Sequence, residues 1–161
     1  MNEKILVPST TIWQSPKKTK AERQENYREY FIELTKTRNL VESLLKSKSA
    51  TKDMRKEVIQ KLNDLLRIYH YGGQVVMTQS VASLNSLDQI DVFDTLADFD
   101  DFSEYNDPYK EHDCASFKVE NGETYIYKID YFDLNLEMHS EDNTNPQVTT
   151  RVMTVMTVSD Y

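Results

Sequence analysis

Residues 114–132 read CASFKVENGETYIYKIDYF, two runs rich in aromatic and β-branched side chains that are separated by Asn121-Gly122. An Asn-Gly pair between such runs is the strongest short-range signal of a β-hairpin, because both residues tolerate the positive φ angles of a two-residue turn. Counting outward from that turn pairs Asp113 with Asp130. The sequence therefore predicts an antiparallel hairpin with two aspartates facing each other at its open end.

The segments around this hairpin add two strands and one helix. Residues 74–79 and 148–158 are rich in β-branched and methionine side chains, which favours strands. Residues 86–99 begin with the capping-box pattern Ser-Leu-Asp-Gln and continue with apolar residues at helical spacing. Residues 133–147 are polar and contain Asn-Thr-Asn-Pro, which is typical of a loop.

Upstream of the sheet, two apolar stripes predict two amphipathic helices. Thr19 and Glu22 form a capping-box pattern at the start of the first helix, and Gly72-Gly73 is expected to end the second as a C-cap. The polar break at residues 46–51 is short, so the two helices should form an antiparallel hairpin. The first stripe consists of Tyr27, Tyr30, Phe31, Leu34, Val41, Leu44 and Leu45, and the second of Met54, Val58, Ile59, Leu62, Leu65, Leu66 and Tyr69.

The predicted fold class is α+β, with an N-terminal antiparallel helical hairpin packed on a small, mainly antiparallel sheet with one further helix. A length of 161 residues suits a single domain. We expect an extended arm at residues 1–18 that Trp13 docks, the helical hairpin at residues 19–71, and an acidic α+β portion at residues 72–161.

Composition argues against several classes of protein. No apolar run approaches the ~20 residues of a membrane span, and the N-terminus lacks the pattern of a signal peptide. A single cysteine, Cys114, allows no disulfide within the chain and no cysteine-rich zinc site, so a reducing, cytoplasmic setting is expected. Three glycines leave no room for a glycine-rich phosphate loop.

The net charge of −8 is unevenly distributed along the chain. Residues 1–87 hold 15 Lys and Arg against 9 Asp and Glu, whereas residues 88–142 hold 3 against 17. Phosphate contacts require Lys and Arg, so direct DNA binding by the acidic half is not expected. An acidic face serves solubility, holds a cation, or competes with nucleic acid for a basic groove on another protein. The candidate carboxylates for such a binding face are Asp98, Asp100, Asp101 and Asp107.

A second polar group is expected at the open end of the predicted hairpin, where the register brings Lys128 and Asp130 to Glu111, His112 and Asp113. Carboxylates with one imidazole suit Mg²⁺, Mn²⁺ or Zn²⁺, and His112, Asp113 and Asp130 are the candidate ligands. A salt bridge from Lys128 that satisfies both aspartates explains the same pattern without a metal or catalysis. No residue is therefore assigned firmly as catalytic or metal-binding. If the protein is an enzyme, the alternative catalytic residues are Glu111, His112, Asp113, Lys128 and Asp130.

Tyrosines recur at alternate positions of the second predicted strand. Tyr125, Tyr127 and Tyr131 should share one face, because side chains alternate along a strand. They form either part of the core or a protein contact surface, in which Tyr is enriched. The density of carboxylates around them disfavours stacking on nucleic-acid bases.

Five ordered segments of the second half resemble a bacterial domain-of-unknown-function family found on plasmids, phages and other mobile DNA. Members of that family read roughly GGRVVLT, FDDF, NDPxGEHD, KIDYYD and TRVLT, so Gln74 and Lys110 stand here where the family has Arg and Gly. The resemblance implies no established activity. It implies accessory work for a mobile element, often interference with host defence. The segments are GGQVVMT at 72–78, FDDF at 99–102, NDPYKEHD at 106–113, KIDYFD at 128–133 and TRVMTVM at 150–156.

Together these observations lead to one expectation and two alternatives. The expectation is a non-enzymatic protein-interaction module of a mobile genetic element, with no cofactor. Its acidic face would occupy the basic groove of a nucleic-acid-handling host defence complex and inhibit it. The first alternative is a hydrolase or nuclease that uses a divalent cation at the carboxylate and histidine cluster. The second is a structural accessory domain that binds another protein through the helical hairpin.

Overall fold

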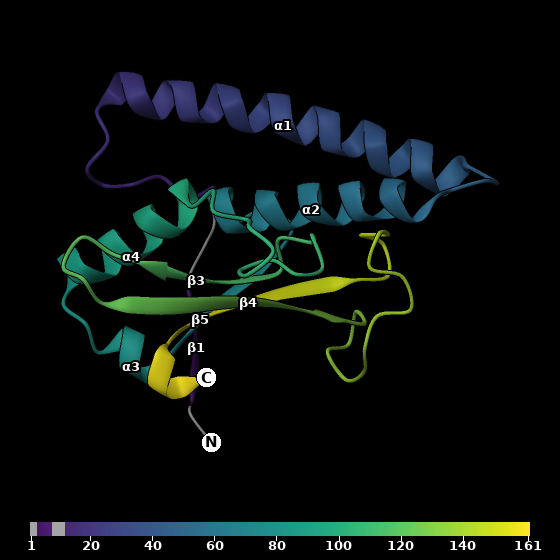
Figure 1. Ribbon diagram of the computed structural model, residues 1–161. Helices are drawn as coiled ribbons and strands as arrows, with labels where there is room; N and C mark the ends of the chain where they lie inside the picture. The colour runs from purple at the N-terminus through teal and green to yellow at the C-terminus, as the bar shows by residue number, and fades with distance from the viewer. Residues whose placement is uncertain (1–2, 8–11) are drawn as a thin grey trace.

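The computed structural model describes residues 3–7 and 12–161, and Figure 1 shows three stacked layers. The outermost layer is one long helix, the middle layer holds two helices, and the third is a five-stranded sheet. The sheet consists of β1 (Lys4–Leu6), β2 (Gly73–Thr78), β3 (Cys114–Lys118), β4 (Thr124–Phe132) and β5 (Thr150–Thr157) in the order β1-β2-β5-β4-β3. The helices are α1 (Lys20–Lys46), α2 (Lys52–Tyr69), α3 (Gln79–Ala82) and α4 (Ser86–Asp98), followed by a 3-10 turn at Val158–Asp160.

The α+β class and the N-terminal helical hairpin are confirmed. The sheet is mainly antiparallel, as predicted, but β2 and β5 run parallel to each other. These two strands approach closely at Gly73, where an added Cβ would lie 2.5 Å from the carbonyl oxygen of Arg151. The residues before the hairpin include the short edge strand β1, which no sequence pattern indicated. Residues 1–2 and 8–11 of the predicted arm lie outside the described residues.

Helix ends follow the local chemistry of the chain, with two corrections. The Thr19 hydroxyl accepts from the Glu22 amide at 3.2 Å and the Glu22 carboxylate accepts from the Thr19 amide at 2.6 Å, so the first capping box is confirmed. Helix α2 ends at Tyr69, and its C-cap is His70 in the left-handed conformation with φ 55°, so the glycine pair is not the C-cap. Helix α4 is capped by Asn85 rather than Ser86, because the Asn85 side chain accepts from the Asp88 amide.

The core lies between the sheet and the middle layer of helices. Trp13 docks the arm on this layer, since its amide donates to the Tyr69 carbonyl at 2.8 Å and its ring stacks on His70 at 5.2 Å. The outer helix α1 contributes less than its stripe predicted, because Phe31 remains 60% exposed and Leu45 45% exposed. No helix in the described ranges is long and apolar enough to cross a membrane. Central core residues are Leu66, Val75, Val92, Leu96, Phe117, Tyr127, Met153 and Val155.

The hairpin of β3 and β4 exists, but its predicted register is wrong by one residue. Cys114 pairs with Lys128 and Phe117 with Tyr125. The turn has three residues, 120–122, because the Val119 amide donates to the Glu123 carbonyl at 3.0 Å. Only Gly122 needs a positive φ, of 91°, in this arrangement. The observed register also places the apolar side chains of both strands on one face toward the helices, whereas the predicted one would have split them between two faces.

Candidate functional site

The carboxylate pair predicted at the open end of the hairpin does not form. The Asp113 carbonyl accepts from the Ile129 amide at 2.6 Å, so Asp113 lies opposite Ile129 rather than Asp130. Side chains alternate along a strand, and Asp113 and Asp130 therefore belong to opposite faces of the sheet. Asp130 instead makes an ion pair with Lys128 on its own strand, at 2.7 Å. A turn of three residues instead of two is the cause of this error.

The alternative metal and catalytic cluster is not assembled either. Nδ1 of His112 lies 3.0 Å from the Asp64 carboxylate, a residue that the sequence did not single out. Among residues 3–7 and 12–161, no group of three or more His, Cys, Asp or Glu side chains could hold a metal ion. Burial raises the pKa of the carboxyls of Glu111 and Asp113, and neighbouring carboxylates raise the pKa of each further. The pattern fits partly buried carboxylates inside a folded loop.

Three of the predicted binding residues, Tyr125, Tyr127 and Asp107, are buried and cannot touch a partner. Tyr125 is 4% exposed and Tyr127 is fully buried, because the corrected register turns them into the core. Tyr131 is half-buried, and its hydroxyl accepts from the Asn63 amide at 2.7 Å. Asp107 is 1% exposed and acts inside its loop instead of on the surface. The tyrosine face is therefore a core face.

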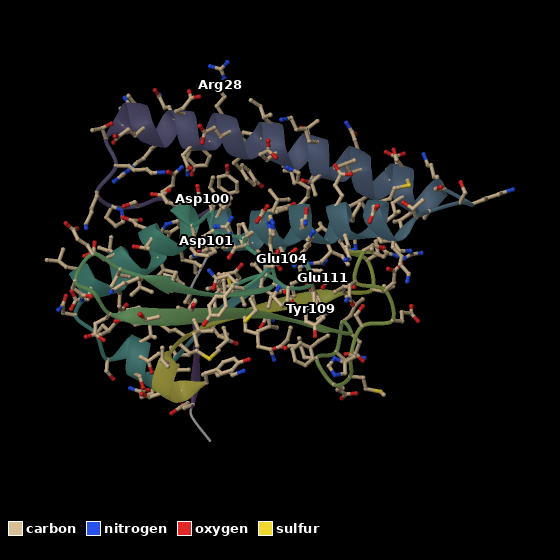
Figure 2. The ribbon with its side chains drawn as sticks, viewed as in Figure 1. Arg28, Asp100, Asp101, Glu104, Tyr109 and Glu111 are labelled. Carbon is tan, nitrogen blue, oxygen red and sulfur yellow. The ribbon has the colours of Figure 1, made fainter. Side chains whose placement is uncertain are left out.

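The remaining predicted carboxylates lie on an exposed segment that we call the acidic loop, residues 98–113, from the last residue of α4 to the residue before β3. Asp98, Asp100 and Asp101 are exposed there, together with Glu104. Tyr105 and Tyr109 in the same loop are 90% and 70% exposed. In Figure 2, the labels of Asp100, Asp101, Glu104, Glu111 and Tyr109 run across the middle of the view, from the level of α2 down toward the sheet.

Helix α2 holds the acidic loop in place through a polar stripe. Gln60, Asn63, Asp64 and Arg67 are spaced i, i+3, i+4 and i+7 and so share one face of the helix. Gln60 donates to the Lys110 carbonyl at 2.5 Å, and Asn63 donates to the Glu111 carbonyl at 2.8 Å. Both hydrogen bonds are made to the backbone of the loop rather than to its side chains.

The last member of the stripe, Arg67, is 3% exposed and binds the carbonyl groups at the C-terminal end of α4. Its Nη1 donates to the carbonyls of Leu96 at 2.8 Å and Phe99 at 3.0 Å, which a helix C-terminus leaves without partners. Nη2 pairs with Asp64 at 3.1 Å, and the guanidinium lies 5.1 Å from the centre of the Phe102 ring. A buried charge with this many partners fixes where the acidic loop leaves α4.

Within the loop, Asp107 acts as an internal cap. Its Oδ1 accepts from the amides of Glu111 at 3.0 Å and His112 at 3.2 Å. Lys110 and His112 take left-handed conformations, with φ 56° and 55°. The Phe102 ring stacks on His112 with centroids 3.6 Å apart. The loop is thus fastened at several points although it has no regular secondary structure.

Cys114, the first residue of β3 after the acidic loop, is half-buried. Burial raises the pKa of its thiol, and the neighbouring Asp113 carboxylate raises it further. A thiol with a raised pKa stays protonated at neutral pH and is a poor nucleophile. The Cys114 side chain is therefore better suited to packing than to nucleophilic chemistry.

A comparison with protein-family models matches residues 77–160 to a family described as "Protein of unknown function (DUF3768)". The chain belongs to the DUF3768 family. The resemblance to an uncharacterised domain family is confirmed on this range, whereas the habitat on mobile DNA stays a prediction. No curated protein and no solved structure matches the chain.

The part that matches DUF3768 contains the whole acidic loop but none of the α2 stripe that holds it. Sequence reasoning missed that stripe because it looked for apolar periodicity alone. The signal was present, since polar residues at 60, 63, 64 and 67 repeat at helical spacing beside the apolar stripe. It also missed Tyr105 and Tyr109, whose exposure only the folded loop reveals.

Proposed function

We propose that this DUF3768 protein is a non-enzymatic interaction module that binds a basic surface of another protein through its acidic loop. The observation that carries the proposal is the composition of that loop. Four exposed carboxylates stand beside two strongly exposed tyrosines on a backbone that α2 holds in place. Asp98, Asp100, Asp101 and Glu104 make no ion pair with any described residue.

Each feature has a physical role in such an interface. Exposed carboxylates speed the encounter with a basic partner, and this attraction is screened beyond a Debye length of ~8 Å at physiological salt. Tyr105 and Tyr109 offer the aromatic anchors that dominate the energy of many interfaces. A loop that is already ordered loses little conformational entropy on binding. Charge thus accounts for recognition at a distance and the tyrosines for retention at contact.

The partner that we propose is a nucleic-acid-binding protein of a host defence complex, with the chain supplied by a mobile element. A groove that receives phosphates is lined with Lys and Arg. Carboxylates along an ordered loop can occupy those same side chains and so exclude the nucleic acid. The resemblance to a family of mobile DNA supports the defence setting, and the loop composition supports the basic groove.

Affinity capture from a bacterial host, read by mass spectrometry, would identify the partner, and surface plasmon resonance would then test the role of the loop. Asp98→Lys with Asp101→Lys should lower the association rate at least tenfold in low salt and change the dissociation rate less. Glu25→Lys with Glu29→Lys makes the same change of charge on exposed positions of α1 and should have little effect.

The two tyrosines provide a separate readout. Tyr105→Ala and Tyr109→Ala remove exposed rings and should speed dissociation with little effect on association. A partner whose binding is unchanged by both the charge reversals and the addition of salt would refute the proposed interface. A partner that does not bind nucleic acid would refute the proposed competition while leaving the interface itself open to the same kinetic test.

A further inference from the structure

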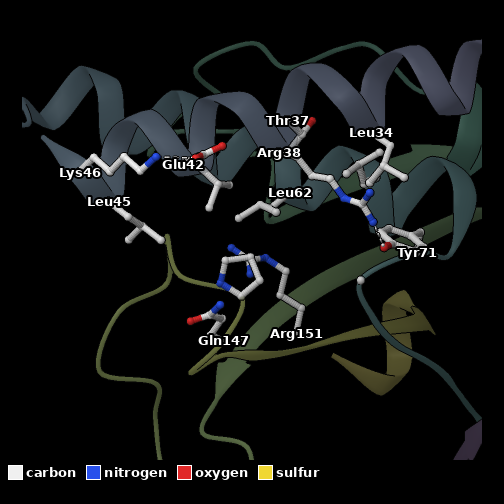
Figure 3. Close-up of a pocket in the computed structure, with 14 residues that line it drawn as sticks. Leu34, Thr37, Arg38, Glu42, Leu45, Lys46, Leu62, Tyr71, Gln147 and Arg151 are labelled. Atoms are coloured by element: carbon white, nitrogen blue, oxygen red, sulfur yellow. Dashed lines mark hydrogen bonds and ion pairs between the residues drawn. The ribbon is translucent and has the colours of Figure 1, made fainter.

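A cavity of about 530 Å³ lies away from the acidic loop, between α1, α2, Pro146-Gln147 and the beginning of β5 (Figure 3). This volume is within the ~300–1,000 Å³ of ordinary small-molecule sites. The wall is mainly apolar, and a few polar side chains converge on it, which is the usual make-up of such sites. The apolar lining consists of Leu34, Val41, Leu45, Leu62, Leu65 and Pro146.

Arg151 forms part of the wall and is 1% exposed. Its Nε donates to Oδ1 of Asn63 at 2.9 Å and its Nη2 to the Asn143 carbonyl, so both hydrogen-bond partners are neutral. Nη1 makes no hydrogen bond with a described residue, and no described carboxylate forms an ion pair with the guanidinium. Burial lowers the pKa of Arg151 to about 10, which still leaves it charged at neutral pH.

None of the other charged side chains that line the cavity forms an ion pair with Arg151. Lys46 and Glu42 pair with each other at one end of the cavity. Arg38 is at the opposite end, and its one hydrogen bond with a described residue goes to the hydroxyl of Tyr71 at 3.2 Å. Figure 3 shows Arg38 reaching down from α1 toward Tyr71, and Arg151 reaching toward Gln147. Arg38 and Arg151 in the lining thus form no ion pair with a described residue. The carboxylates of Glu111 and Asp142, outside the lining, attract Arg151 without pairing with it, and its guanidinium lies 5.3 Å from the centre of the Tyr131 ring.

We propose that this cavity binds a small organic monoanion with an apolar body, of which a medium-chain carboxylate is the simplest example. Its carboxylate would accept from Nη1 of Arg151 in a charge-assisted hydrogen bond, and its chain would lie along the leucines and Val41. Arg38 at the rim attracts the anion from solvent. Burying a cation that forms no ion pair is costly, and an anionic ligand that pairs with it reduces that cost. The site does not depend on the proposed protein interface.

Decanoate is a suitable probe, titrated into the full chain and followed by isothermal calorimetry and by amide chemical shifts. We expect saturable one-site binding, with shifts centred on residues 34–46 and 143–151. Decanol and decylamine have the same chain without the negative charge and should bind at least tenfold more weakly. Arg38→Gln should weaken decanoate several-fold, and Arg28→Gln, on an exposed part of α1 outside the cavity, should not change its affinity.

Arg151→Gln should lower the affinity for decanoate at least tenfold, but loss of a buried arginine can also unfold the chain. Val41→Phe therefore serves as the second variant, since Val41 is only half-buried and a larger ring fills the cavity without removing a hydrogen bond. It should weaken decanoate at least tenfold while the circular dichroism stays that of wild type. Absence of saturable binding, equal binding of decanol, or unchanged binding to Val41→Phe would each overturn the proposal.

Discussion

Replacing Asn63 by Ala should strongly destabilise the protein. Asn63 is fully buried, and its amide nitrogen donates to the Glu111 carbonyl and to the hydroxyl of Tyr131. Its Oδ1 accepts from Nε of Arg151. One side chain thus satisfies three polar groups that come from the acidic loop, from β4 and from β5.

The expected loss follows from the groups that the substitution leaves behind. A buried polar group without a partner costs about 1–3 kcal/mol, and more where it is charged. The Asn63→Ala variant leaves the Glu111 carbonyl and the Arg151 guanidinium each one bond short, for a total of about 3–5 kcal/mol. That loss is a large share of the ~5–15 kcal/mol that stabilises a typical protein.

Urea denaturation followed by circular dichroism measures this loss directly. With a slope of about 2 kcal/mol/M, the midpoint should fall by about 2 M while the slope stays constant. Asn39→Ala, the same substitution at an exposed position of α1, should change the stability by less than about 0.5 kcal/mol. A midpoint for Asn63→Ala within about 0.5 M of wild type would refute the reasoning from three shared hydrogen bonds.

Three further outcomes are expected from other parts of the molecule. Burial lowers the pKa of His70 to about 4, below its ordinary 6.5, so His70 of the unfolded chain is protonated at a higher pH than His70 of the folded chain, and about 3 kcal/mol of stability should be lost as the pH falls from about 6.5 to 4. His70→Asn, which suits the left-handed backbone, should flatten this pH dependence when urea midpoints are measured, and His139→Gln should not. Lys110→Gly should raise the free energy of unfolding by about 1 kcal/mol, because Lys110 has φ 56°, and an equal gain from Lys110→Ala would contradict this account. Gly73→Ala should lower the melting temperature far more than Gly72→Ala, since the Cβ added at Gly73 would lie 2.5 Å from a backbone oxygen of β5. A Cβ at Gly72 would meet open space, so that only the positive φ of Gly72 disfavours alanine there, and similar losses for the two variants would show that the close approach of the strands does not limit the choice of residue at position 73.

The features that the sequence predicts well are those that depend on neighbours along the chain. The Thr19 and Glu22 capping box, the two apolar stripes and the strand pair around Gly122 all have their signal within a few residues. Features that depend on distant partners were missed. The parallel pairing of β2 with β5 joins segments about 80 residues apart, and no local pattern specifies it.

The hairpin register shows how a local signal can be right about an element and wrong about a site. Asn121-Gly122 fits a turn of two residues or of three, and both need a glycine at a positive φ. The choice between them depends on which face of β4 meets the helices, and burying Tyr125 and Tyr127 together with Phe117 decides it. The proposed pairing of aspartates depended entirely on that choice, so a difference of one residue removed it.

The same dependence on distant partners explains why the acidic loop is held by residues outside the family match. Helix α2 precedes the matched residues 77–160, yet Arg67 donates to carbonyls at the end of α4 and Asn63 donates to the Glu111 carbonyl of the acidic loop. In return, the matched region supplies the acceptors that make burial of Arg67 tolerable. Each half therefore satisfies buried polar groups of the other. The acidic loop takes its shape from α2, so the residues that present the carboxylates and those that position them belong to different parts of the sequence.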